Sequence, residues 1–238
     1  MSTTPLNYAS PSIQYAYNLA NNPVVQKDSH NYYTGLTVNE LNSLGNTSLL
    51  DIYMTAGNVI EPHYHQNASE LVYGIIGTAT VSLINPFTNQ LLSFRVHPGT
   101  VVNIPQGWWH YIIAESAHTH MLAIFDAPVI DVIFGSDILR LTPPGVLAHT
   151  YCLNEAALKE VLAPLQSTVA IGPPEGCMQR QEQPSSYRQE EAGHPDYAPV
   201  GGVAVGHDVE YGHHHRPQHV PTAEYPFHPI PFLYRRWV

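Results

Sequence analysis

A run of short β-prone segments, separated by turn signals, is the feature that most restricts how this chain can fold. Thr78–Ile84 alternates polar and apolar residues, which is the period of a half-buried strand. Asn85–Asn89 predicts a turn, and Leu91–Val96 predicts the returning strand. Segments repeated about every 8–12 residues predict an all-β sandwich or barrel. Further strands are expected at Thr47–Thr55, Thr100–Ile104, His110–Ala114, His120–Phe125 and Val129–Phe134.

The pattern changes after these strands. Pro143-Pro144 predicts the start of a helix, and Asn154 is expected to cap a second helix that runs through Leu162. Residues 178–238 hold eight prolines and seven of the fifteen histidines but few aliphatic residues, so burial there cannot offset chain entropy. We therefore expect four parts: an N-terminal arm with the first strands (1–44), a barrel core (45–140), a helical segment (141–177) and an irregular, low-complexity tail rich in His, Tyr and Pro (178–238).

Charge and composition exclude several classes of protein. Nine Lys and Arg against nineteen Asp and Glu give a net charge of -10, which argues against a nucleic-acid partner. No apolar run approaches the length of a membrane span, so we expect no membrane insertion. Met1–Tyr17 lacks a basic and an apolar region, so no secretory signal and an intracellular location are expected. Cys152 and Cys177 do not make a disulfide scaffold.

Two segments with fixed spacing carry the candidate site. They read Gly57-x5-His63-x-His65-x4-Glu70-x6-Gly77 and Gly99-x5-Pro105-x-Gly107-x2-His110. His63 and His65 are two apart on an extended segment, so both imidazoles face the same side. Glu70 is expected to begin the next strand after a short turn. Three neutral imidazoles and one carboxylate, from His63, His65, Glu70 and His110, can bind a divalent metal and leave positions open for a ligand.

These two segments resemble the two motifs of the cupin superfamily. Nine motif positions match, and Ala114 stands at the one position where Asn is usual. The resemblance covers roughly residues 15–165 and extends to the flanks of germins and oxalate-decarboxylase-type cupins. It implies a double-stranded β-helix, a jelly-roll barrel, with the metal inside and a homo-oligomeric assembly. It also implies Mn²⁺ as the metal, with Fe²⁺ or Zn²⁺ as alternatives.

The resemblance implies a manganese-dependent oxidoreductase or decarboxylase that acts on a small molecule, because the relatives include oxalate oxidases and oxalate decarboxylases. The contacts to oxalate are replaced here. Ile60 stands where decarboxylases have Arg and germin oxidases have Asn, and Leu50 aligns near a second pocket Asn. Ala127–Asp131 replaces the decarboxylase lid. We therefore expect a more apolar pocket, with Glu61 and Asp131 as candidate acid–base residues and a solvated loop position as the alternative for Glu61.

Two other functions stay open. A non-enzymatic protein could use the barrel as a metal-stabilised scaffold and the tail to bind another protein or to assemble. The composition of the tail is similar to that of coat-layer proteins of bacterial spores, so a spore-coat location is a further possibility. A cupin that binds or senses a small ligand is the third hypothesis. The run His213–His215 is either a metal-binding stretch or solvated low-complexity sequence.

Overall fold

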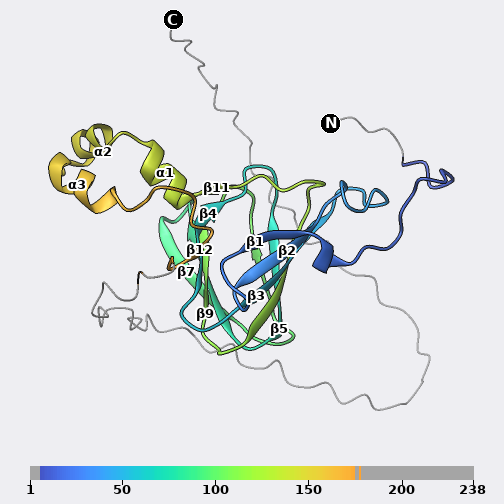
Figure 1. Cartoon of the computed structure of the whole chain (residues 1–238). Coiled ribbons are helices and arrows are strands. Elements are labelled where there is room, and N and C mark those ends of the chain that lie inside the picture. Colours follow the sequence, from blue (N-terminus) through green and yellow to red (C-terminus); the bar gives the residue numbers. More distant parts are fainter. Residues whose placement is uncertain (1–5, 175–176, 178–238) are drawn as a thin grey trace, which may run out of the picture. The chain divides into compact units, whose positions relative to one another are not determined.

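The computed structural model describes residues 6–174 and 177, in which twelve strands form two antiparallel sheets (Figure 1). The first sheet contains, in spatial order, β1 (Pro23–Gln26), β2 (Tyr32–Leu36), β3 (Ser48–Met54), β10 (Thr119–Phe125), β5 (Glu70–Ile76) and β8 (Val101–Ile104). The second contains β11 (Ile133–Phe134), β4 (Val59–Tyr64), β9 (His110–Ala114), β6 (Ala79–Asn85) and β7 (Gln90–Val96), with β12 (Ile171–Gly172) also paired to β4. This arrangement confirms the expected all-β jelly roll.

The predicted hairpin is present. β6 and β7 pair antiparallel across the Asn85–Asn89 turn, with Ser82 opposite Ser93. The Asn85 side chain accepts hydrogen bonds from the backbone N–H groups of Phe87 and Thr88, which stabilises this turn.

The prediction of a strand at Val129–Phe134 is wrong except for the last two residues, which form β11. The backbone carbonyl groups before β11 have partners outside any strand ladder. Val129 O accepts from the Asn67 side chain, and Asp131 O accepts from the His65 ring. Because these acceptors are already satisfied, apolar composition alone does not make the segment a strand.

Three helices follow the strands of the jelly roll: α1 (Gly135–Leu141), α2 (Pro144–Tyr151) and α3 (Glu155–Leu162); a short 3-10 turn, η1 (Leu19–Asn21), precedes β1. The predicted helix starts are confirmed: Pro144 opens α2, and Asn154 Oδ1 accepts from the Ala157 N–H at 2.9 Å. The sequence did not predict α1, which contacts β4 and β11. None of the helices in the described part of the chain is long and apolar enough to cross a membrane.

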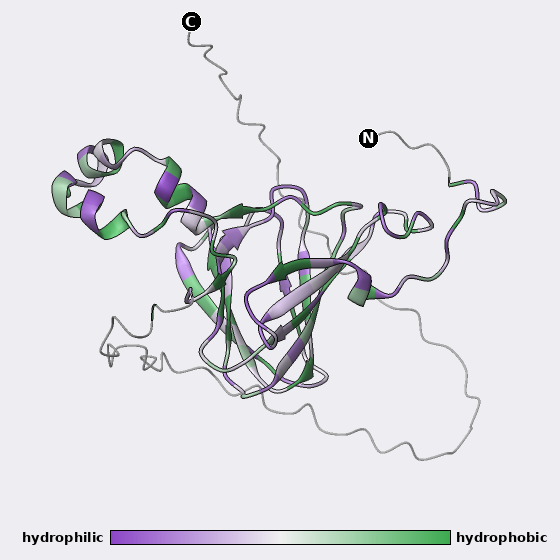
Figure 2. Cartoon of the chain, in the orientation of Figure 1, coloured by the Kyte–Doolittle hydropathy of each residue, from purple (hydrophilic) through white to green (hydrophobic). Residues whose placement is uncertain are grey.

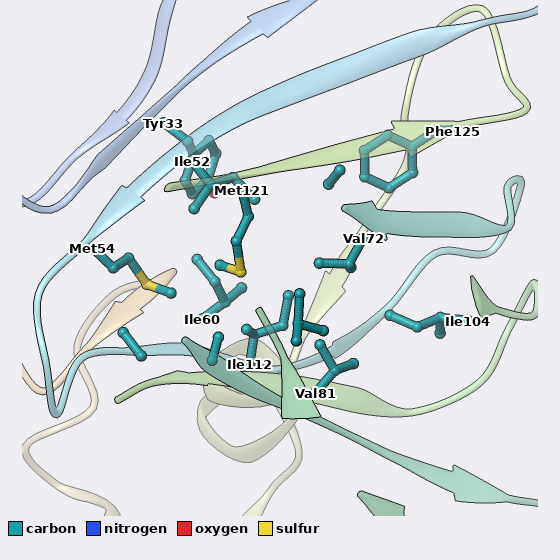
Figure 3. Packing of buried hydrophobic residues seen from close by; sticks show 14 of the residues in the cluster. Tyr33, Ile52, Met54, Ile60, Val72, Val81, Ile104, Ile112, Met121 and Phe125 are labelled. Carbon is teal, nitrogen blue, oxygen red and sulfur yellow. The ribbon is translucent and has the colours of Figure 1, made fainter. Parts of the chain in front are cut away.

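The apolar core lies between the two sheets. Residues on β10 alternate between buried and half-buried positions, so Met121, Ala123 and Phe125 point inward. Figure 2 shows hydrophobic and hydrophilic residues mixed along the strands, as expected for sheets with one inner face. Figure 3 shows the inward side chains packed together, among them Met54, Val72, Val81, Ile104 and Ile112. Burying each such side chain contributes about 1.5–3 kcal/mol, and this packing holds the strands that carry the candidate site.

Candidate metal centre

The structure brings the four predicted ligand residues together from three strands. His63 lies on β4, Glu70 is the first residue of β5, and His110 is the first residue of β9. His65 follows directly after the end of β4. All four side chains are buried, and one donor atom from each lies within 4.8 Å of the others.

Local backbone geometry places Ile60 and His63 of β4 on the inner face of the sheet. A register shift between Ile60 and His63 lets both residues point inward although they are three apart in the sequence. His63 is then directly opposite His110 on β9, which brings their ring centroids to 4.0 Å.

Backbone carbonyl groups orient all three imidazole rings. Nδ1 lies 2.7 Å from Glu61 O in His63, 2.9 Å from Asp131 O in His65, and 2.9 Å from Trp108 O in His110. A carbonyl oxygen only accepts, so each Nδ1 carries the proton. Each ring therefore directs Nε2 toward the cluster, which is the arrangement in which a histidine offers Nε2 to a metal.

The Nε2 atoms have few protein partners. His65 Nε2 is buried and forms no hydrogen bond among the described residues, although it lies 3.3 Å from Glu70 Oε2. His110 Nε2 lies 2.9 Å from the same carboxylate oxygen. Because Nδ1 of this ring already donates to Trp108 O, Nε2 donates to Glu70 only in the doubly protonated ring, and a metal ion at Nε2 would replace that second proton. A buried nitrogen without a hydrogen bond is costly unless something else satisfies it. The donor set therefore fits a bound divalent cation.

Burial and mutual interactions set the charges in the cluster. Burial, together with the nearby His110, lowers the pKa of His63 to about 3, so its ring is neutral at ordinary pH. Burial opposes ionisation of Glu70, but the hydrogen bond from His110 outweighs it and lowers the pKa of this carboxyl. Burial likewise opposes charge on His110, but its contact with Glu70 raises the pKa of that ring. The cluster therefore combines an anionic carboxylate with imidazole donors.

A cavity of about 240 Å³ adjoins the cluster. His63, His65 and Glu70 contribute to its wall, and most of the remaining wall is apolar. Ile60 and Leu50, which we expected at the positions of polar oxalate contacts, both line it, so the wall is apolar at these two positions.

The structure brings neither candidate acid–base side chain to this cavity. Glu61 is buried rather than solvated, so the interpretation as a solvated loop residue is wrong. Its carboxylate accepts hydrogen bonds from the Ser136 N–H and hydroxyl, at 2.8 and 2.9 Å, and from the Ala170 N–H at 2.7 Å. It thereby ties β4 to the start of α1 and to the residues before β12. The Asp131 side chain is exposed, and this residue contributes its backbone carbonyl to His65 instead.

Sequence reasoning missed several residues of the cavity. Tyr33 on β2 and Phe134 on β11 both line it, and the Phe134 ring lies 5.7 Å from the ring of His63. Neither residue belongs to a spaced motif. The only available signal for Tyr33 was its place in a β-prone stretch, Tyr32–Leu36. Such a signal predicts a strand but does not say which other strand will pair with it.

The fold and the cluster define this protein as a jelly roll with a buried three-histidine, one-glutamate centre. A sequence profile described as Cupin matches residues 17–157, and the chain belongs to this family. Glycinin G4 from Glycine max is 25% identical over 141 residues, which are 52% of this chain and 23% of glycinin. A germin-like protein (subfamily 2 member 1) from Arabidopsis thaliana is 26% identical over 136 residues, 55% of this chain and 61% of that protein.

Solved structures show the same fold. The coconut allergen cocosin aligns with a TM-score of 0.60 at 20% identity, over 68% of this chain and 44% of cocosin. A mutant of Bacillus subtilis oxalate decarboxylase aligns with a TM-score of 0.59 at 23% identity, over 66% of this chain and 41% of the decarboxylase. The chain thus spans less than two thirds of each of these relatives.

Proposed function

We propose that this protein is a germin-like metalloenzyme, a manganese-dependent oxidoreductase or decarboxylase that acts on a small molecule. The observation that carries the proposal is the convergence of three buried imidazoles and one buried carboxylate beside a largely apolar cavity. The similarity to a germin-like protein and the fold shared with an oxalate decarboxylase support the same class. Fe²⁺ and Zn²⁺ are the alternative metals, because imidazole and carboxylate donors suit all three ions.

The chain's own residues prepare the site for this chemistry. His63, His65, Glu70 and His110 would hold the ion, which would act as a Lewis acid that binds and polarises a ligand. The three backbone carbonyl groups fix the rings before the ion arrives, so little side-chain entropy remains to be lost on binding. Most of the cavity wall is apolar, so it offers few competing polar groups to a ligand on the ion.

The first prediction concerns the metal. Replacing His63 and His65 with Ala should remove nearly all bound divalent metal, because two of the four donors are lost. Mass spectrometry of metals in the purified protein measures this. The natural protein should also unfold at a higher temperature with its metal than after chelation, because the ion binds the folded state.

A matched control is the double variant His97→Ala and His118→Ala. Both of these histidines are exposed and lie outside the cluster, so the control loses the same number of imidazoles. It should keep its metal. Full occupancy in the His63/His65 variant would show that the four residues are not the ligands.

The second prediction concerns oxalate. Turnover should be weak or absent, because Ile60 and Leu50 offer no donor to a buried carboxylate and cannot compensate for its desolvation. Assays for carbon dioxide, formate and peroxide with the metal-loaded protein measure this. Rapid formation of any of these products from oxalate would contradict the prediction.

A further inference from the structure

Beyond the metal ligands, the wall of the cavity carries almost no charge. Its apolar part, which we call the apolar wall, consists of Val24, Val25, Leu50, Ile52, Ile60, Ile112, Phe125, Val129, Ile130, Val132 and Phe134. No Lys or Arg lines the cavity, and Glu70 is the one carboxylate that does. Figure 3 shows Ile52, Ile60, Ile112 and Phe125 projecting into the interior between the sheets.

Cations elsewhere in the described part of the chain already have partners. Arg95 pairs with Glu115, Arg140 with Asp137 and Lys159 with Glu155, all with exposed or partly exposed groups. The Lys27 ammonium donates to the Asn58 side chain. None of these cations reaches the cavity wall to neutralise a second negative group of a ligand.

The charge balance of the site follows from this. A divalent ion beside the Glu70 carboxylate and neutral imidazoles leaves one net positive charge. A single negative charge on a ligand neutralises it, whereas a dianion would leave an unpaired charge against an apolar wall, which is unfavourable.

Tyr33 is a lining residue of the same cavity whose side chain carries a hydrogen-bond donor. Its side chain is 5% exposed and lines the cavity, and its hydroxyl has no hydrogen-bond partner among residues 6–174 and 177. Burial raises the pKa of Tyr33, and the negative charges of Glu61 and Glu70 raise it further, so the phenol keeps its proton. A phenol without a protein partner, on a residue that lines a cavity, is a group to which a ligand can bind.

The size of the cavity limits the ligand. A cavity of about 150 Å³ accommodates benzene. The present cavity, about 240 Å³, therefore has room for a compact apolar group with a small polar head.

We propose that the cavity binds a monoanionic, metal-chelating head group on a compact apolar body, with the Tyr33 hydroxyl donating a hydrogen bond to the ligand. This inference rests on the proposed function, because it requires the ion. It adds the chemical class of the ligand and a specificity-determining residue that lies outside both spaced motifs.

The test compares three probes on metal-loaded protein by calorimetry, after metal content has been measured. Benzohydroxamate has the chelating head and an apolar ring, acetohydroxamate has the same head without the ring, and oxalate is a dianion without an apolar body. Benzohydroxamate should bind at least tenfold more tightly than either of the others. Equal affinity for the two hydroxamates, or tighter binding of oxalate, would overturn the proposal.

A Tyr33→Phe variant tests the donor. It should keep its fold and metal content and bind benzohydroxamate at least fivefold more weakly. The matched control is Tyr73→Phe, at an exposed position of β5, which should bind as the natural protein does. Unchanged affinity in Tyr33→Phe overturns the role of this residue.

The metal site and the ligand class can each be contradicted by a different result. Natural protein that takes up no divalent metal contradicts the proposed function, and the ligand class falls with it. Metal-loaded protein that shows no preference for the apolar probe contradicts the ligand class alone.

Discussion

At the scale of single residues, the motif glycines serve the backbone rather than the chemistry. Gly57, Gly77, Gly99 and Gly107 all have positive φ angles, between 72° and 84°. Gly77 has a second constraint, because a Cβ there would overlap the backbone carbonyl oxygen of His118. At Gly57 no atom lies within 4 Å of the position that a Cβ would take. A side chain at Gly57 would therefore cause backbone strain alone, whereas a side chain at Gly77 would cause both backbone strain and steric overlap.

The third prediction compares substitutions at Gly57 and Gly77. Gly57→Ala should destabilise the fold by about 1–2 kcal/mol, the usual cost of a left-handed conformation for an L-residue. Gly77→Ala should cost at least about 3 kcal/mol, because overlap with a backbone atom adds to the strain. Urea unfolding of both variants measures the difference. Equal losses would mean that the turn at Gly77 relaxes without cost.

At the scale of elements, Asp126 ties the end of β10 to the start of β5. Its carboxylate accepts from the Ser69 N–H at 2.8 Å and from the Ser69 hydroxyl at 2.7 Å. The hydroxyl bond, followed by the backbone bond, lowers the pKa of Asp126 below its usual 3.8. Glu70 is the next residue after Ser69 and the first residue of β5. This contact therefore helps to fix the position of Glu70.

The fourth prediction follows from the direction of this shift. A depressed carboxyl pKa contributes stability above the unfolded-state value, and this contribution is lost as pH falls through the folded-state value. Asp126→Asn, which resembles the protonated acid, should therefore be less stable than the natural protein at pH 5. The difference should shrink toward pH 3. Thermal unfolding at both pH values measures this. A stability difference between the two proteins that does not change with pH would show that the charge of Asp126 does not contribute to stability.

At the scale of the whole molecule, the described residues already contain the whole candidate site. The twelve strands and three helices end by Gly172, and all four cluster residues lie before Tyr111. The tail expected at 178–238 lies outside the described residues. Its composition, with Trp237, Arg235 and Arg236 near its end and five tyrosines, supplies aromatic and cationic groups for contacts with other chains. We propose that it serves assembly, as a homo-oligomer or with another protein.

The fifth prediction is that a chain ending at Gly176 stays folded and keeps its metal but associates differently. The reason is that residues 178–238 add no periodic apolar face to the core. Association of the full chain should also depend on pH, because the seven histidines beyond residue 177 gain charge as pH falls through about 6.5. Light scattering and metal analysis of both chains measure this. Unfolding or metal loss in the shorter chain would place the tail in the core.

The sequence by itself determined the features that depend on local spacing. The period of two predicted β6, the turn signal after it predicted the returning strand β7, and the cap at Asn154 predicted α3. The spacing of histidines and Glu70 predicted which four side chains would meet. Each of these follows from the geometry of a strand, turn or helix end over a few residues, which the chain encodes directly.

Only the tertiary structure decided what surrounds those side chains. Tyr33 reaches the cavity because β2 pairs with β3, and Glu61 is buried because α1 and the residues before β12 return to β4. Asp131 contributes a carbonyl group to His65 across 66 positions of sequence. These contacts depend on which distant segments pack together. The local periodicity of the sequence does not indicate this. The four cluster residues could therefore be inferred from spacing, while the apolar cavity beside them required the assembled sheets.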